Sequence, residues 1–203
     1  LVGIDREALH RGDWLVAPVV ALTTARFDAW LRLWPQESKD LKAGTRVQVH
    51  LGATVVTASV APLQSERLAP GDAGLVQLVL QRPIGAWRGD RVVLRDASAT
   101  RTIAGGQVVD PVAPARYRRT AQRLDELAAL RRDTPLSRRE ALLAVSPLGV
   151  DLERFNQAEG QVLAPPAAID ALVHDGWALG RRHYDRAREQ VVTSLAAFHQ
   201  QQP

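Results

Sequence analysis

The spacing of apolar residues changes once along this chain, near the stretch "VVDPVAPARYRR" at 108–119. Before this stretch, short runs alternate apolar and polar residues, which is the pattern of strands with one buried face. After it, apolar residues recur every three or four positions, which is the pattern of amphipathic helices. The change predicts an all-β unit followed by a mainly helical unit.

The first part predicts several short antiparallel strands. In "TRVQVHLG" (45–52), Val47, Val49 and Leu51 point one way and the polar residues between them point the other. Strands of this length and spacing favour a closed barrel or a sandwich over a parallel sheet with crossover helices. Similar runs, bounded by glycine, proline or acidic turns, lie at 54–60, 74–80, 91–96 and 105–110.

The second part predicts three short helices, a hairpin and a last helix. Ser137, followed three residues later by Glu140, has the pattern of a capping box at a helix start. "ALVHDGWALG" (171–180) predicts two strands joined by an Asp-Gly turn. This order is typical of a winged-helix domain. The expected helices lie at 116–132, 134–145, 150–160 and 183–202.

Composition is that of an ordinary globular protein, with 46% hydrophobic and 24% charged residues. No run approaches the ~18 consecutive apolar residues of a membrane span, so we expect no membrane association. The lack of cysteine fits a cytoplasmic protein. Because the chain begins at Leu1 and contains no methionine, we expect it to be a piece of a longer protein.

The basic residues are almost all arginines. Of 26 lysines and arginines, only Lys39 and Lys42 are lysines. This bias fits a GC-rich genome, and it also fits a surface that binds phosphate through the planar guanidinium group. The net charge of +4 is small, so a nucleic-acid surface would have to be local.

The glycine pair Gly105 and Gly106 does not form a nucleotide-binding loop. It lies between two expected strands and lacks the lysine of a P-loop, so we expect it to permit a bulge or a close approach of strands. The five histidines lack metal-ligand spacing, and no nucleophile elbow or acid–base pair is present. We therefore expect no catalytic residue, metal site or cofactor in this chain, which by itself is not an enzyme.

Several motifs, taken in order, resemble the elongation factor Tu-like translation GTPases. "GIDREALHRGDWLVAP" (3–18) is similar to the end of their second domain. "LKAGTRVQVHLGATVVTASV" (41–60), "LAPGDAGLVQLVL" (68–80) and "RPIGAWRGDRVVLRD" (82–96) resemble their third-domain barrel. The "HLGA" stretch, "LRDASATRTIAGG" and the helical continuation resemble the selenocysteine-specific elongation factors (SelB), which carry winged helices after the third domain.

This resemblance implies a domain-3-like antiparallel β barrel followed by an α+β winged-helix domain. It divides the chain into the end of domain 2 (1–17), the barrel (18–113) and the winged helix with a connecting helix (114–203). The implied function is delivery of selenocysteinyl-tRNA to the ribosome. The other implied partners are the GTPase domain of the same chain, which would bind GTP and Mg²⁺, and an mRNA hairpin bound by later modules.

The resemblance also implies a tRNA contact at the loop "RDASATR" (95–101), with a second group around the "HLGAT" turn. Arginine suits phosphate, and small residues and hydroxyls suit a close approach to the RNA backbone. An alternative is that Arg95 and Arg101 only pair with Asp96 and Asp90 on a solvated barrel edge. The candidate tRNA-binding residues are Arg95, Asp96, Ala97, Ser98, Arg101, His50 and Thr54.

For the winged helix, the basic clusters at 116–123 and 180–188 are interpreted as a solvated face of a spacer. A different class of function is a DNA-binding regulator with a β-barrel sensing domain. It would use 152–158 as a recognition helix, and Glu153 and Glu159 count against that use. A third alternative is a structural spacer whose barrel packs on the GTPase domain without touching RNA.

Overall fold

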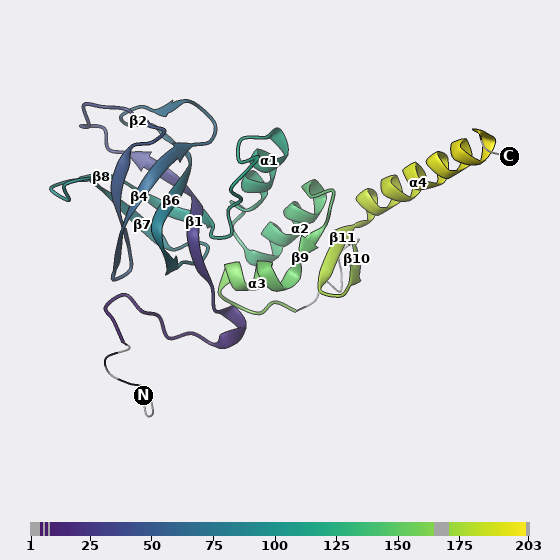
Figure 1. Ribbon diagram of the computed structural model, residues 1–203, viewed down its shortest axis with the longest axis horizontal. Helices are drawn as coiled ribbons and strands as arrows, with labels where there is room; N and C mark the ends of the chain where they lie inside the picture. Colours follow the sequence, from purple (N-terminus) through teal and green to yellow (C-terminus); the bar gives the residue numbers. More distant parts are fainter. Residues whose placement is uncertain (1–4, 6, 8, 165–170, 202–203) are drawn as a thin grey trace.

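The computed structural model describes residues 5, 7, 9–164 and 171–201. Figure 1 shows the barrel on the left, three short helices beside it, and a long last helix that extends away from the rest. Within the described residues, no helix is both long enough and apolar enough to cross a membrane.

A closed antiparallel barrel of six strands forms the first part, as predicted. Its strands follow one another in the order β1–β6–β4–β3–β7–β8. Alternate side chains fill the interior, among them Phe27, Leu31, Leu78 and Leu94, which are fully buried. The strands are β1 (Thr23–Leu33), β3 (Arg46–Leu51), β4 (Thr54–Pro62), β6 (Ala73–Gly85), β7 (Arg91–Asp96) and β8 (Thr102–Asp110).

Shorter elements flank the barrel. A two-stranded sheet joins β2 (Leu41–Lys42) to β5 (Arg67–Leu68), and a 3₁₀ turn, η2 (Pro18–Val20), precedes β1. Residues 9–17 run along one end of the barrel, where the Trp14 and Trp87 rings meet edge to face at 5.4 Å.

Of the two adjacent glycines in β8, only Gly106 is required by the packing of the strands. A Cβ on Gly106 would lie 1.9 Å from the carbonyl oxygen of Trp30 in β1, so only glycine permits this close approach of strands. A Cβ on Gly105 would lie 3.7 Å from its nearest atom, which is ordinary contact. The prediction is confirmed for Gly106 and wrong for Gly105.

The second part has the order of helices and strands that the sequence predicted. A three-stranded sheet, β10–β11–β9, packs with the helices, and α4 leaves the sheet. The elements are α1 (Ala121–Ala129), α2 (Pro135–Val145), β9 (Val150–Asp151), α3 (Leu152–Glu159), β10 (Ala171–His174), β11 (Trp177–Gly180) and α4 (Arg181–Gln201).

The helix ends follow local capping chemistry. Helix α3 begins after Asp151, whose side chain caps it, and ends at Gly160 with φ at 67°, as predicted. The expected cap of α2 was wrong: Thr134 is the N-cap and forms the capping box with Ser137, so Ser137 occupies the third helical position. Helix α1 is shorter than predicted because Thr120 caps it.

The barrel and the winged helix share one hydrophobic cluster. Leu75 and Val109 from barrel strands pack with Leu127, Leu143 and Phe155 from α1, α2 and α3, and all five side chains are buried. Trp30, on the outer face of β1, packs against the same cluster. This contiguous apolar interface joins the two parts into one packed body.

Buried ion pairs complete the interface. Arg123 of α1 donates to Asp28 of β1 at 2.6 Å and to Asp110 of β8 at 2.5 Å, and all three side chains are at most 10% exposed. Burial raises the pKa of Asp28 against the opposing charge of Arg123. Burial acts on Asp110 in the same direction, but the charges of Arg123 and Arg88 outweigh it and lower the pKa of that carboxyl.

A second buried group uses the end of α3. Glu159, which is 2% exposed, pairs with Arg88 of the barrel and with Arg138 of α2, the latter at 2.6 Å. The basic cluster at 116–123 was interpreted as a solvated face, and this was wrong for Arg123, which is buried. Arg119 is exposed as expected, and it also donates to the Pro62 carbonyl at 2.8 Å. These arginines bind the two parts together.

Candidate nucleic-acid interface

The outer faces of β3 and β7 carry the polar side chains that the sequence singled out. In the antiparallel register, Gln48 lies opposite Arg95, and His50 lies opposite Val93. Their neighbours along each strand point into the barrel, since Val49 and Leu94 are fully buried. His50 and Arg95 therefore lie on one outer surface, on adjacent strands.

Two nitrogens on this surface lack partners. The Nε atom of Arg95 and the Nε2 atom of His50 are shielded by neighbouring atoms and have no hydrogen-bond partner among the described residues. Buried polar atoms are nearly always hydrogen-bonded in folded proteins. Both atoms are out of reach of an external ligand, so a phosphate at this surface would be met by the terminal nitrogens of the half-buried Arg95 side chain.

Asp96 shapes the loop between β7 and β8. One of its carboxylate oxygens accepts from the amides of Thr100 at 2.7 Å and Arg101 at 3.2 Å. The other accepts from the hydroxyls of Thr100 at 2.6 Å and Ser98 at 2.9 Å. Ala99 has a left-handed φ of 56° at the loop tip. The structure thus gives Asp96 the task of holding the loop.

The bonds in this loop have a titration consequence. The Thr100 hydroxyl, with further donors in the loop, holds the pKa of Asp96 below its usual range. Because the folded-state pKa is depressed, the loop's stabilisation is complete above about pH 4 and is lost as pH falls through the lowered value.

We expect Asp96→Ala to speed amide hydrogen exchange at Thr100 and Arg101 several-fold, because both amides lose their acceptor. Exchange measured by NMR checks this, and Asp133→Ala is the control, since Asp133 is exposed on another loop. Unchanged exchange at both amides would contradict the loop-holding role.

The remaining predicted residues differ in their surroundings. Arg101 is exposed but pairs with Glu37 at 2.9 Å and lies 4.0 Å from Asp96, so part of the solvated-pair alternative holds for it. No ion pair of Arg95 occurs among the described residues. Ala97 and Ser98 are exposed on the loop. Thr54 is 4% exposed, and its hydroxyl donates to the Gly12 carbonyl at 2.9 Å, which ties the N-terminal segment to the barrel.

Helix α3 packs toward the barrel, so it does not present a free face to a groove of DNA. Its last turn places Glu159 on Arg88, and the Arg88 guanidinium lies 5.3 Å from the centre of the Phe155 ring. The Arg88 amide also donates to the Ala158 carbonyl at 2.8 Å. A helix held in this way is a poor recognition helix, which counts against the DNA-binding alternative.

Sequence reasoning missed other arginines on the same outer surface. They are exposed and come from β1, β7 and the connection between α1 and α2, so they are far apart along the chain and form no sequence motif. These residues are Arg32, Arg91, Arg131 and Arg132. Among residues of the described ranges, no group of three or more His, Cys, Asp or Glu residues is arranged to hold a metal ion.

Comparison with known proteins agrees with the barrel and with the order of the motifs. Residues 28–115 match the family described as "Selenocysteine-specific elongation factor, beta-barrel domain". This segment of the chain belongs to that family.

Similarity to the selenocysteine-specific elongation factors extends over most of the chain. That of Haemophilus influenzae is 26% identical over 98% of this chain and 32% of its own length. That of Escherichia coli is 29% identical over 97% of this chain and 31% of its own length. The factor of Desulfomicrobium baculatum is 28% identical over 64% of this chain. The chain thus spans about a third of the length of the first of these relatives.

Proposed function

We propose that this chain serves as the barrel and first winged helix of a selenocysteine-specific elongation factor, and that the barrel contacts selenocysteinyl-tRNA. The observation that carries the proposal is the match of the closed barrel, residues 28–115, to the family's barrel domain. The division at 1–17, 18–113 and 114–203 is part of the proposal. So are a cytoplasmic location and the placing of GTP, Mg²⁺ and GTP hydrolysis in a GTPase domain of the complete protein.

The contact surface consists of the β7–β8 loop and the outer face of β3 and β7. Arg95 is its centre, because it has no ion pair among the described residues, whereas Arg101 pairs with Glu37. His50 and Ser98 flank it. Arg101 contributes when a phosphate of the tRNA replaces Glu37 as its ion-pair partner. In this arrangement, Asp96 and Thr54 hold the loop and the barrel end in place, while the ribosome and an mRNA hairpin are met by other parts of the protein.

Arg95→Ala tests this proposal in the complete GTP-bound protein. We expect the affinity for selenocysteinyl-tRNA to fall about tenfold, because one charge-assisted hydrogen bond is worth roughly 1.5 kcal/mol. The slope of log K against log salt should become shallower by about 1. Equilibrium binding at several salt concentrations measures both quantities.

Arg67→Ala is the matched control, because Arg67 is equally basic but pairs with Asp40 on the separate β2–β5 sheet. It should leave affinity and salt slope unchanged. If Arg95→Ala binds tRNA like the control, Arg95 makes no contact with the tRNA backbone, and the spacer alternative gains.

A further inference from the structure

The arginines near the junction of the barrel and the winged helix differ in their surroundings. Arg88, Arg123 and Arg138 are buried and pair with carboxylates inside the protein. Another five are not found in any ion pair among the described residues. We call these five the arginine track, and its members are Arg32, Arg91, Arg95, Arg131 and Arg132.

The strand register places the barrel members of the track together. Arg91 of β7 lies opposite Gln107 of β8, which in turn lies opposite Trp30 of β1. One step along, Arg32 of β1 lies opposite Gly105, and Gly105 lies opposite Val93. Since Arg95 follows Val93 by two residues, it projects from the same outer face as Arg91.

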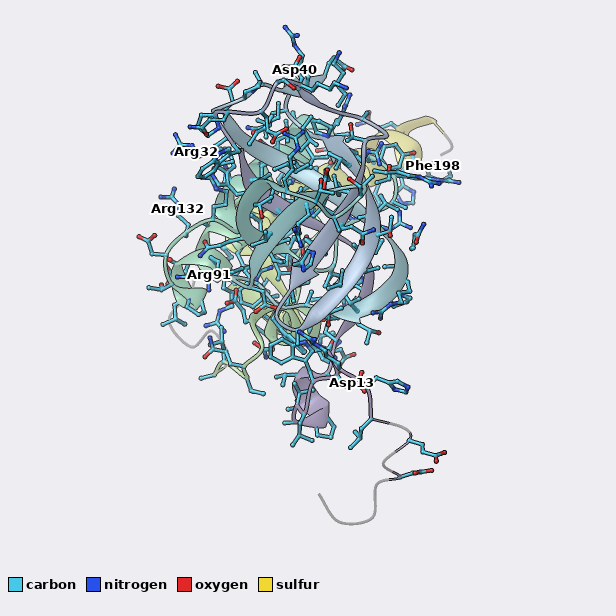
Figure 2. All side chains as sticks on the ribbon, turned by 90° about the vertical axis from the view of Figure 1, so that its left-hand side faces the viewer. Asp13, Arg32, Asp40, Arg91, Arg132 and Phe198 are labelled. Carbon is cyan, nitrogen blue, oxygen red and sulfur yellow. The ribbon has the colours of Figure 1, made fainter. Side chains whose placement is uncertain are left out.

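The winged helix supplies the other two members. The guanidinium of Arg131 lies over the Trp30 ring at 3.6 Å from its centre. Arg131, Arg132 and Gln107 line one cleft of about 380 Å³ between the barrel and α1. Figure 2 shows Arg32, Arg132 and Arg91 along one edge of the molecule. The track therefore crosses the junction between the two parts.

This arrangement fits an RNA backbone. Stacking on Trp30 holds the Arg131 guanidinium in place while its N–H groups stay available for phosphate. From β1 across β8 to β7, two strand spacings cover roughly 10 Å, which is enough to meet more than one phosphate. The nearby carboxylates include Asp133, which is exposed, Asp90, which accepts from the Trp87 amide at 2.8 Å, and Asp96, which accepts from donors of its own loop. Five arginines outnumber them.

We propose that the arginine track is a continuous phosphate-binding surface for the tRNA, and that Arg131 and Arg132 make the winged helix part of the tRNA-binding site. This rests on the proposed function and extends it, because the winged helix then contacts RNA directly. The shared core fixes the position of Arg131 and Arg132 relative to Arg95, so one RNA molecule meets both parts at once.

The test uses the complete GTP-bound protein, selenocysteinyl-tRNA and two double variants, Arg131→Ala/Arg132→Ala and Arg32→Ala/Arg91→Ala. Each should weaken binding about 10- to 100-fold at low salt and make the salt slope shallower by about 2. The control is Arg182→Ala/Arg186→Ala, which removes the same charge from exposed positions on α4. It should bind like the unmodified protein.

Arg131→Lys separates charge from packing. It keeps the charge but changes the stacking on Trp30, so it should retain most of the salt slope. Arg132→Glu should weaken binding more than Arg132→Ala and leave the unfolding midpoint unchanged, since the Arg132 side chain is exposed and has no hydrogen bond or ion pair within the described ranges.

The outcomes distinguish this inference from the proposed function. If Arg95→Ala weakens tRNA binding and the two double variants behave like the control, the inference is wrong and the proposed function stands. If the double variants lose affinity for ribosomes alone, the track meets ribosomal RNA and the assignment to tRNA is overturned. Failure of the unmodified protein to bind selenocysteinyl-tRNA would overturn both proposals.

Discussion

Replacing Arg123 with methionine should lower the free energy of unfolding by about 3–5 kcal/mol, because it leaves the buried Asp28 carboxylate without a cation and Asp110 with only Arg88, at 3.9 Å. Asp28 has no exposed side-chain surface and Asp110 is 9% exposed, so water cannot replace the guanidinium. The loss should appear in chemical denaturation of the purified chain. Arg119→Met is the matched control: Arg119 also reaches the barrel, but it pairs with the exposed Glu66 and should lose only about 1 kcal/mol.

The Arg123→Met defect should shrink on acidification. Without Arg123, burial raises the folded-state pKa of Asp28 further above the unfolded value of about 3.9, while Asp110 keeps the charge of Arg88. A carboxyl with a raised folded-state pKa destabilises the protein increasingly as pH rises through that range, and this penalty is absent when the group is protonated. Adding Asp28→Asn and Asp110→Asn should recover part of the loss at neutral pH. An equal defect from pH 7 to pH 4 would contradict the electrostatic explanation.

Gly106→Ala should destabilise the barrel by about 2–4 kcal/mol, because an added methyl group meets backbone rather than a flexible side chain. The new Cβ would lie 1.9 Å from the Trp30 oxygen and 3.0 Å from the Leu31 Cα, both in β1. Strands β1 and β8 would have to separate at the point where the barrel closes. Thermal and denaturant unfolding measure the loss.

Gly105→Ala provides an internal control one residue away. It should change stability by less than about 1 kcal/mol, since its Cβ has ordinary contacts and alanine restricts the unfolded chain more than glycine does. Similar losses for the two variants would show that the contact at Gly106 is not special.

Part of the fold could be predicted because apolar and polar residues alternate clearly in barrel strands that have one face in solvent. Val47, Val49 and Leu51 in β3 show this alternation, and the sequence located that strand to within a residue at each end. Strand β1 was missed because the winged helix covers its outer face. Asp28 is buried and Trp30 is partly buried there, so apolar and polar residues no longer mark the inside and the outside.

The candidate site was predictable only along short stretches of chain. The loop at 95–101 is local, so a family motif could locate it. The role of Asp96 within the loop depends on donors at Ser98, Thr100 and Arg101, which a motif does not reveal. The pairing of Arg123 with Asp28 joins residues 95 positions apart, and no local pattern could show that a helical arginine is buried against a strand.

Because the barrel and the winged helix share a core, a rotation of the barrel also moves α4. With 21 residues, this helix is about 30 Å long, and it leaves a sheet whose base is anchored through α2 and the barrel. If α4 stays straight and keeps its angle to the barrel, a rotation of the barrel by a tenth of a radian displaces the C-terminal end of α4 by roughly 3 Å relative to its N-terminal end. If the barrel turns when it binds a ligand, the far end of α4 moves further than the base of the helix does.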